Sequence, residues 1–250
     1  MTTRSFLING LLAGLLAGFL AFLVAHQVGE PPVDAAIEVE HAGAAHSHSH
    51  EEDGPVVSRA NQSTWGLATG TLVVGTALGG LVGLVAAGAM GRLGRLTPGQ
   101  STATVAAIGF VAVALVPFLK YPATPPAVGD ADTIGDRTAL YFTFLVISVL
   151  AAIAATVLAR QVWARAGTYA GVLSGAGAYL LVMVVAAVVM PTVNELGDFP
   201  ADTLWSFRLG SVLTLTTMWA VIGTALTGLV GRAAAQHTRD VTRRELAASL

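Results

Sequence analysis

The chain contains no cysteine and little charge. Of its 250 residues, 54% are hydrophobic and 11% are charged, against about 25% charged residues in ordinary soluble proteins. The absence of cysteine excludes a disulfide framework, a thiolate metal site and a catalytic cysteine. Any metal must therefore be bound through nitrogen and oxygen ligands, with methionine sulfur as a minor contributor. The shortage of charge excludes a soluble globule and is typical of an integral membrane protein.

Lysine is also scarce. The single lysine, Lys120, is followed by Tyr121, which excludes a phosphate-binding loop of the Walker type. No nucleophile with a neighbouring base stands out, so we expect no enzymatic activity and no permanently bound cofactor. Basic residues are few and line the membrane side of the loops, which speaks against nucleic-acid binding. The expected contacts are therefore with membrane lipid, ions and protein partners.

Six apolar blocks are long enough to cross a bilayer as helices, for which about 20 residues suffice. Their interiors contain no Lys, Arg, Asp, Glu or His. Strands are not expected, because the blocks lack a period of two and an open sheet cannot satisfy its backbone in lipid. We predict an all-α, polytopic integral membrane protein with six transmembrane helices in one membrane domain, 1–250. The predicted spans are residues 6–25, 65–90, 101–119, 139–159, 168–190 and 209–230.

The loops between these blocks are segregated by charge. Nine of the thirteen basic residues lie in the amino terminus, loops 91–100 and 160–167, and the tail 231–250. The positive-inside rule places these segments, and hence both termini, in the cytoplasm, with the tail 231–250 as a cytoplasmic extension. The other loops carry thirteen of the fifteen acidic residues. We therefore predict a multi-pass protein of the cell membrane whose outer face attracts cations.

The first apolar block carries Gly10, Gly14 and Gly18 at four-residue spacing. Small residues at this spacing allow two helices to approach closely in lipid. A cleaved signal peptide is the alternative for this segment, because Arg4 precedes the apolar run and small residues follow it. A signal peptide has no use for a packing face, so the spacing favours a retained helix.

Loop 26–64 holds most of the histidines. It is rich in Ala, Gly, Pro, Ser and acids and has no clear periodicity, so we expect it to be flexible without metal. Imidazole beside carboxylate suits divalent Co, Ni, Zn or Cu. The alternative is a solvated loop whose histidines bind metal only adventitiously. The candidate metal ligands are His41, His46, His48, His50, Glu51, Glu52 and Asp53, with His26 at the end of the first span.

Two further segments lie at predicted outer helix ends, where proline ends a helix. The candidates to line an ion pathway or its mouth are Lys120, Met190, Asn194, Glu195 and Arg208. Lys120 and Arg208 are expected to pair with Glu195 or Asp202. The alternative is that these segments only anchor the helices, because aromatic residues there are typical of membrane interfaces.

The segments Pro117–Gly129, PFLKYPATPPAVG, and Met190–Ser211, MPTVNELGDFPADTLWSFRLGS, resemble the CbtA-type family of probable cobalt transporter subunits. The resemblance extends over essentially the whole chain. It implies cobalt uptake in the service of cobalamin synthesis, with a small single-span partner subunit, CbtB. It also implies metal-binding roles for His41, His46, His48 and His50, and places Lys120, Asn194, Glu195 and Arg208 among the functional residues.

The leading hypothesis is a membrane subunit that captures Co²⁺ at the outer face through the histidine loop and passes it inward, with its partner or as a homo-oligomer. The alternative is a membrane metal sensor or scaffold without a path of its own, because no ionisable group lies deep in any span. A nickel or zinc transporter differs from the leading hypothesis only in its substrate.

Overall fold

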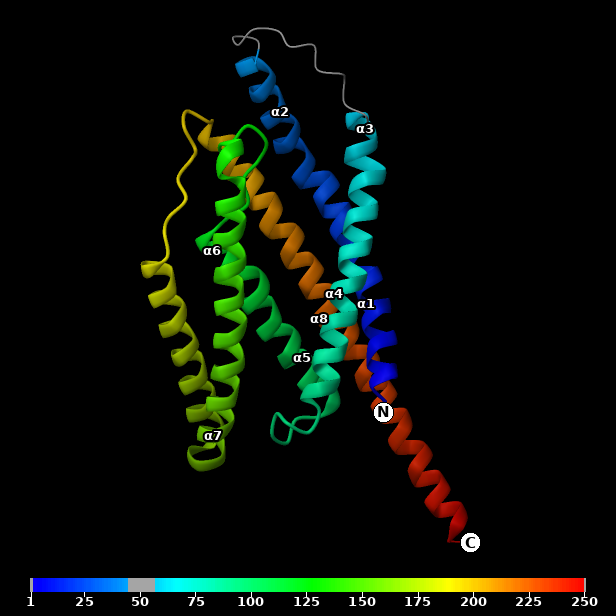
Figure 1. The fold of residues 1–250 in the computed structure, drawn as a ribbon. Coiled ribbons are helices and arrows are strands. Elements are labelled where there is room, and N and C mark those ends of the chain that lie inside the picture. Colours follow the sequence, from blue (N-terminus) through cyan, green and yellow to red (C-terminus); the bar gives the residue numbers. More distant parts are fainter. Residues whose placement is uncertain (1, 45–56, 250) are drawn as a thin grey trace. The chain divides into compact units, whose positions relative to one another are not determined.

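A computed structural model describes residues 2–44 and 57–249. All regular elements in these two ranges are helical (Figure 1), which agrees with the predicted all-α class. Among the described residues, five helices are long and apolar enough to cross a membrane, so the chain is an all-α membrane protein. They are Thr3–Ala42, Arg59–Ala89, Pro98–Lys120, Ile134–Val189 and Ala201–Ala248.

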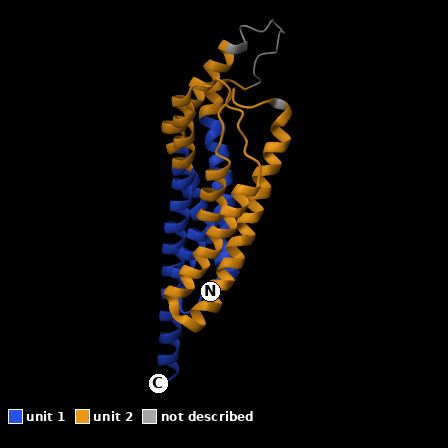
Figure 2. Ribbon diagram, turned by 90° about the vertical axis from the view of Figure 1, so that its left-hand side faces the viewer, with its two compact units in different colours: residues 1–23, 64–109, 215–250 blue, residues 24–63, 110–214 orange. Residues whose placement is uncertain are grey.

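The chain divides into two compact units, which Figure 2 shows in separate colours. Unit 1 comprises residues 1–23, 64–109 and 215–250, and unit 2 comprises residues 24–63 and 110–214. Unit 1 is built mainly from α1 (Thr3–Val24), α4 (Leu67–Ala89), α5 (Pro98–Gly109) and the second half of α8 (Ala201–Ala248).

Within unit 1, α1 and α4 pack backbone against backbone. Gly10, Gly14 and Gly18 of α1 face the α4 glycines Gly75 and Gly79 and the neighbouring Thr71. A Cβ at Gly14 would overlap the carbonyl oxygen of Gly75 and lie 2.9 Å from its carbonyl carbon. Only glycine permits this approach, which gives the two helices dense van der Waals contact. In lipid, which is as apolar as the side chains, such close packing is what drives two helices to associate.

The second half of α8, itself part of unit 1, packs a regular apolar face against the other helices of that unit. Ile222, Leu226 and Val230 recur every four residues and are fully buried. One turn earlier, the ring of Trp219 lies against α5, where a Cβ at Gly109 would be 2.7 Å from it. Beyond residue 230 the helix continues to Ala248 with mostly exposed side chains.

In unit 2, α7 (Ile134–Val189) is two antiparallel legs joined at Gly167. Gly167 has φ 86° and ψ 172°, a conformation that is open to glycine and strained for other residues. The legs 134–166 and 168–189 lie side by side (Figure 1). Gly171 and Gly175 of the second leg allow this close approach, since both lie against Ala159 of the first leg. The predicted spans 139–159 and 168–190 therefore both fall within α7.

Two π-helical turns in unit 2 precede prolines. Ala25–Gly29 (η1) comes before Pro31 and Pro32, and Phe110–Leu115 (η3) comes before Pro117. Proline has no backbone N–H to donate to the previous turn. The helix widens there into a π-turn, in which carbonyls accept hydrogen bonds from N–H groups five residues later. In η1, the N–H of Glu30 bonds to the carbonyl of Ala25, five residues earlier.

In the described parts of loop 26–64, residues 26–44 and 57–64, the structure corrects the prediction of an irregular loop. Residues Glu30–Ala44 form α2, Arg59–Asn61 form α3, and Gln62–Gly66 form the π-turn η2. Helix is favoured in α2 by its alanines and glutamates. Carboxylates on α2 also bind Arg59 of α3, a contact between distant residues that local periodicity does not reveal.

Candidate functional site

The candidate site lies in unit 2, where the loops 121–133 and 190–200 meet; we call this region the loop end. Lys120 ends α6 (Val116–Lys120) and donates hydrogen bonds from Nζ to the carbonyls of Ala187, at 2.8 Å, and Met190, at 3.2 Å. The last carbonyls of a helix lack intrahelical donors and attract cations. Lys120 therefore caps α7, which ends because Pro191 follows Met190.

Tyr121 strengthens this attachment. Its hydroxyl donates to the carbonyl of Pro191 at 2.7 Å. A phenol is protonated and able to donate at neutral pH, and burial raises the pKa of this hydroxyl further. The Tyr121 ring also packs edge-on against Phe144, with ring centroids 5.7 Å apart. Lys120 and Tyr121 together tie the end of α6 to the end of α7, and we refer to them as the clamp.

Glu195 joins the two loops. Its Oε2 accepts hydrogen bonds from the Thr133 hydroxyl, at 2.8 Å, and the Asp130 backbone N–H, at 3.1 Å, and lies 3.5 Å from Arg137 Nε. Arg137 also donates to the carbonyl of Asp130 at 3.0 Å. The side chains of Arg137 and Glu195 are 21% and 28% exposed, so solvent screens the pair only in part.

Gly129 makes room for Arg137. A Cβ at Gly129 would lie 2.6 Å from the guanidinium carbon, and the residue has φ 96°. Glycine is therefore required here both by the backbone conformation and by the close guanidinium. This arrangement holds the Arg137 charge where it meets Glu195.

A pocket of about 650 Å³ opens at the loop end. One wall comes from α2, through Val39, and the others come from the two loops. Three of its lining residues carry carboxylates: Asp130, Glu195 and Asp198. A pocket of this composition attracts cations. Within residues 2–44 and 57–249, however, no three His, Cys, Asp or Glu side chains are grouped to hold a metal.

An ionic cluster connects α2 to α3. Arg59 binds Asp34, with 2.8 Å between Nε and Oδ1, and also binds Glu30. Near this cluster, His26 Nδ1 lies 3.0 Å from the carbonyl oxygen of Ser63. These contacts hold together the two helical segments that flank residues 45–56.

The predicted metal ligands are only partly described by the structure. His41 is exposed in the last turn of α2, and His26 is half-buried in η1. His46, His48, His50, Glu51, Glu52 and Asp53 lie outside the described residues. Their role as ligands therefore remains a prediction from sequence.

The predicted pathway residues are brought together in part. Lys120, Met190 and Glu195 lie at the loop end, and Asn194 is exposed beside them on the same loop. The expected pairing of Lys120 or Arg208 with Glu195 or Asp202 was wrong. Lys120 binds backbone carbonyls, and the partner of Glu195 is Arg137. Arg208 lies half-buried in α8, where its Nε has no hydrogen-bond partner among the described residues.

Sequence reasoning missed Asp130, Thr133 and Arg137 as parts of the site. One signal was available: Arg137 follows an acidic, glycine-containing stretch, where a lone arginine needs a carboxylate partner. The stretch does not indicate which carboxylate that is, because the partner comes from a loop much later in the chain, as Arg137 and Glu195 show.

Comparison with known proteins gives one family. The family model described as "Probable cobalt transporter subunit (CbtA)" matches residues 3–231, which is nearly the whole chain. No curated protein and no solved structure shows significant similarity to the chain.

Proposed function

Because the chain belongs to the CbtA family of probable cobalt transporter subunits, we propose that it is the membrane subunit that captures Co²⁺ at the outer face of the cell membrane and passes it inward. The observation that carries this proposal is the acidic pocket at the loop end. It is lined by Asp130, Glu195 and Asp198, and α2 reaches it through Val39, two residues before His41.

In this proposal the histidine segment acts first and the pocket second. Imidazoles of His41, His46, His48 and His50, with Glu51, Glu52 and Asp53, bind the ion, and His26 is a further ligand nearer the membrane. The carboxylates of the pocket then attract it by charge. Nickel and zinc would bind the same ligands, so selectivity must come from geometry imposed during transport. Co²⁺ is the substrate, and the protein needs no resident cofactor or enzymatic step.

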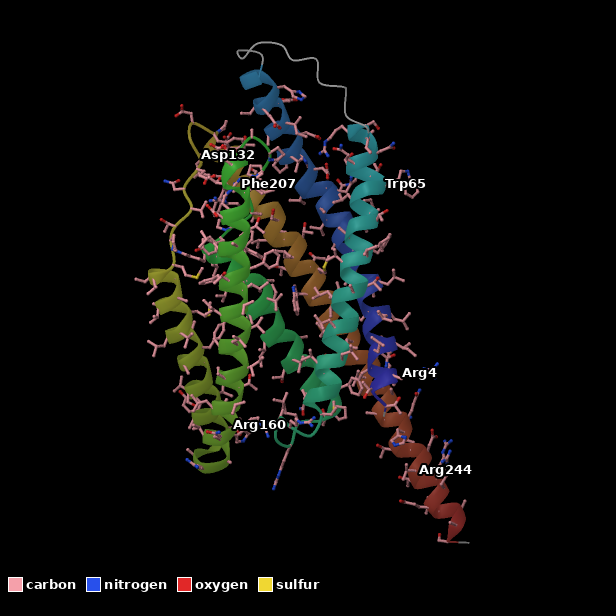
Figure 3. The ribbon with its side chains drawn as sticks, in the orientation of Figure 1. Arg4, Trp65, Asp132, Arg160, Phe207 and Arg244 are labelled. Atoms are coloured by element: carbon pink, nitrogen blue, oxygen red, sulfur yellow. The ribbon has the colours of Figure 1, made fainter. Side chains whose placement is uncertain are left out.

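The proposed topology has six crossings with both termini in the cytoplasm. The reversal of α7 at Gly167 supports two crossings by that helix. In unit 2, Arg160 lies at the opposite end of the first α7 leg from Asp132, as Figure 3 shows. Arginine at one end and acid at the other is the distribution that the positive-inside rule expects.

Cysteine labelling tests this topology, since the chain has no cysteine of its own. Asp198→Cys at the loop end and Ala166→Cys beside the α7 reversal are both exposed sites within unit 2. A membrane-impermeant maleimide is expected to label Asp198→Cys in intact cells and Ala166→Cys only after lysis. Labelling of both in intact cells would overturn the proposed crossings by α7.

The chain is a transporter subunit by family, so a partner is expected. We propose a small single-span CbtB-type subunit as that partner, with a homo-oligomer as a further possibility for completing the path. The imported cobalt would supply cobalamin synthesis. Close helix packing of the kind made by the glycines of α1 is how such spans associate in lipid.

Uptake of radiolabelled cobalt by cells without other cobalt importers tests the function. The change is His41/His46/His48/His50→Ala, compared with the intact chain, each with and without the small partner. The expected result is a rise of about tenfold in the cobalt concentration needed for half-maximal uptake, because four imidazole ligands are lost. His237→Ala, in the exposed tail, is the matched control and should behave like the intact chain.

Glu195→Gln is a second arm of the same experiment. It removes one of the three carboxylate charges that line the pocket and retains an oxygen that accepts hydrogen bonds, so uptake should weaken without loss of the protein from the membrane. Unchanged uptake by both the histidine variant and Glu195→Gln would contradict capture at these residues. Excess nickel or zinc during uptake shows which metal the protein prefers.

A metal sensor or scaffold is the second candidate function. The observation that favours it is that the interiors of the six apolar blocks contain no Lys, Arg, Asp, Glu or His, the groups that often line a translocation path. Purified protein in liposomes distinguishes the two candidates, because a scaffold gives no cobalt flux with or without the partner subunit.

A further inference from the structure

A buried chain of hydrogen bonds crosses unit 2 at the level of the proline break in η3. Pro117 is buried and cannot donate to the carbonyls four and five residues earlier, which belong to Val113 and Ala112. In the apolar interior of a membrane span, no water is available to replace the missing donor. One of these carbonyls, that of Ala112, accepts a hydrogen bond from a side chain instead.

The donor is Ser148 of the first α7 leg. Its hydroxyl donates to the carbonyl of Ala112 at 2.7 Å and lies 2.8 Å from the hydroxyl of Tyr179, on the second leg. The single proton of Ser148 is used on Ala112, so Tyr179 must be the donor in the second bond. Ser148 is 0% exposed, Ala112 3% and Tyr179 9%.

This chain connects three segments of unit 2: η3 and both legs of α7. Directly after η3, α6 contains only Val116–Lys120. It is held at its beginning by Ser148, through Ala112, and at its end by the clamp, Lys120 and Tyr121. Phe144, one turn before Ser148, packs against the Tyr121 ring and so links the two attachments.

The direction of α6 sets where loop 121–133 begins, and that loop supplies Ala127, Gly129 and Asp130 to the pocket. We propose that Ser148 and Tyr179 are positioning residues: by bonding the carbonyl that Pro117 leaves unpaired, they fix the bend at η3 and thereby hold loop 121–133 against loop 190–200. They touch no ion. They act on the pocket through α6. A cobalt-uptake test of this role rests on the proposed function, whereas a test of the distance between the loops does not.

Ser148→Ala tests this role, with one milder variant beside it. Tyr179→Phe leaves the bond from Ser148 to Ala112 in place. The matched control is Ser101→Ala. Ser101 is 2% exposed, and its hydroxyl has no hydrogen-bond partner among the described residues, so its loss should alter neither loop.

The first readout is the distance between the loops and does not depend on transport. Spin labels at Asp132→Cys and Val193→Cys, both exposed and one on each loop, report it by pulsed electron resonance in a chain otherwise free of cysteine. Ser148→Ala should broaden or shift the distance distribution. Tyr179→Phe should do so less, and Ser101→Ala should leave it unchanged.

The second readout is cobalt uptake. Ser148→Ala should raise the half-saturating cobalt concentration about three- to tenfold, the effect of losing one hydrogen bond that positions a binding site, with a smaller change in maximal rate. An unchanged distance distribution in folded Ser148→Ala protein would overturn the inference, whatever the uptake. Failure of the intact chain to take up cobalt would instead overturn the proposed function and leave the distance result standing.

Discussion

Gly14→Ala is expected to prevent α1 from docking on α4 and to leave little folded protein. The new Cβ would overlap the carbonyl oxygen of Gly75 and lie 2.9 Å from the Cα of Thr76. Both obstacles are backbone atoms of a regular helix and cannot rotate away as a side chain would. Overpacking of this kind costs about 1–3 kcal/mol, and more where backbone atoms cannot move aside, a large part of the stability of a typical protein.

The measurement is the yield and thermal unfolding of purified protein in detergent. Gly70→Ala is the matched control, because Gly70 lies on α4 and a Cβ there would meet nothing within 4 Å. Alanine also favours helix over glycine, so this control should be as stable as the intact chain or slightly more stable. If Gly14→Ala purifies with the melting temperature of Gly70→Ala, the close contact between α1 and α4 does not exist in the protein.

Lys120→Met is expected to destabilise the loop end and to weaken cobalt uptake. Methionine has nearly the length of lysine but donates no hydrogen bond, so the carbonyls of Ala187 and Met190 lose their charged partner. Loss of hydrogen bonds from a charged donor costs about 2 kcal/mol. The end of α7 should then detach from α6, and the loop that carries Glu195 should become less ordered.

Two controls separate the charge from the packing. Lys120→Arg keeps the positive charge and its donors and should recover most of the stability. Leu119→Met, at a side chain that is 71% exposed, introduces the same residue one position earlier and should be neutral. Thermal unfolding of all three in one detergent compares them, and a Lys120→Met protein as stable as Leu119→Met would show that the carbonyl contacts contribute nothing.

The features that could be predicted from sequence are those that depend on residues close together in the chain. The length of an apolar block and the four-residue spacing of Gly10, Gly14 and Gly18 are local properties. They predict an all-helical membrane protein and a helix face made for close packing. The partner of that face, on α4, appears only when the helices are assembled.

The candidate site shows the same limit more clearly. The sequence places Lys120 and Glu195 in two segments at helix ends, but it led to the wrong pairing between them. Arg137 pairs with Glu195 because Gly129 leaves space for its guanidinium, while Lys120 binds carbonyls at the end of α7. Which charges meet depends on how two distant loops fold against each other.

The sequence by itself determined the class of this protein, its membrane environment and its family, because hydrophobic length, glycine spacing and characteristic segments can be read along the chain. The tertiary structure alone decided that Arg59 binds carboxylates of α2 and that Ser148 supplies the donor that Pro117 withholds. Each of these depends on a partner distant in sequence. In an apolar interior, an unpaired carbonyl or charge is costly enough to select that partner.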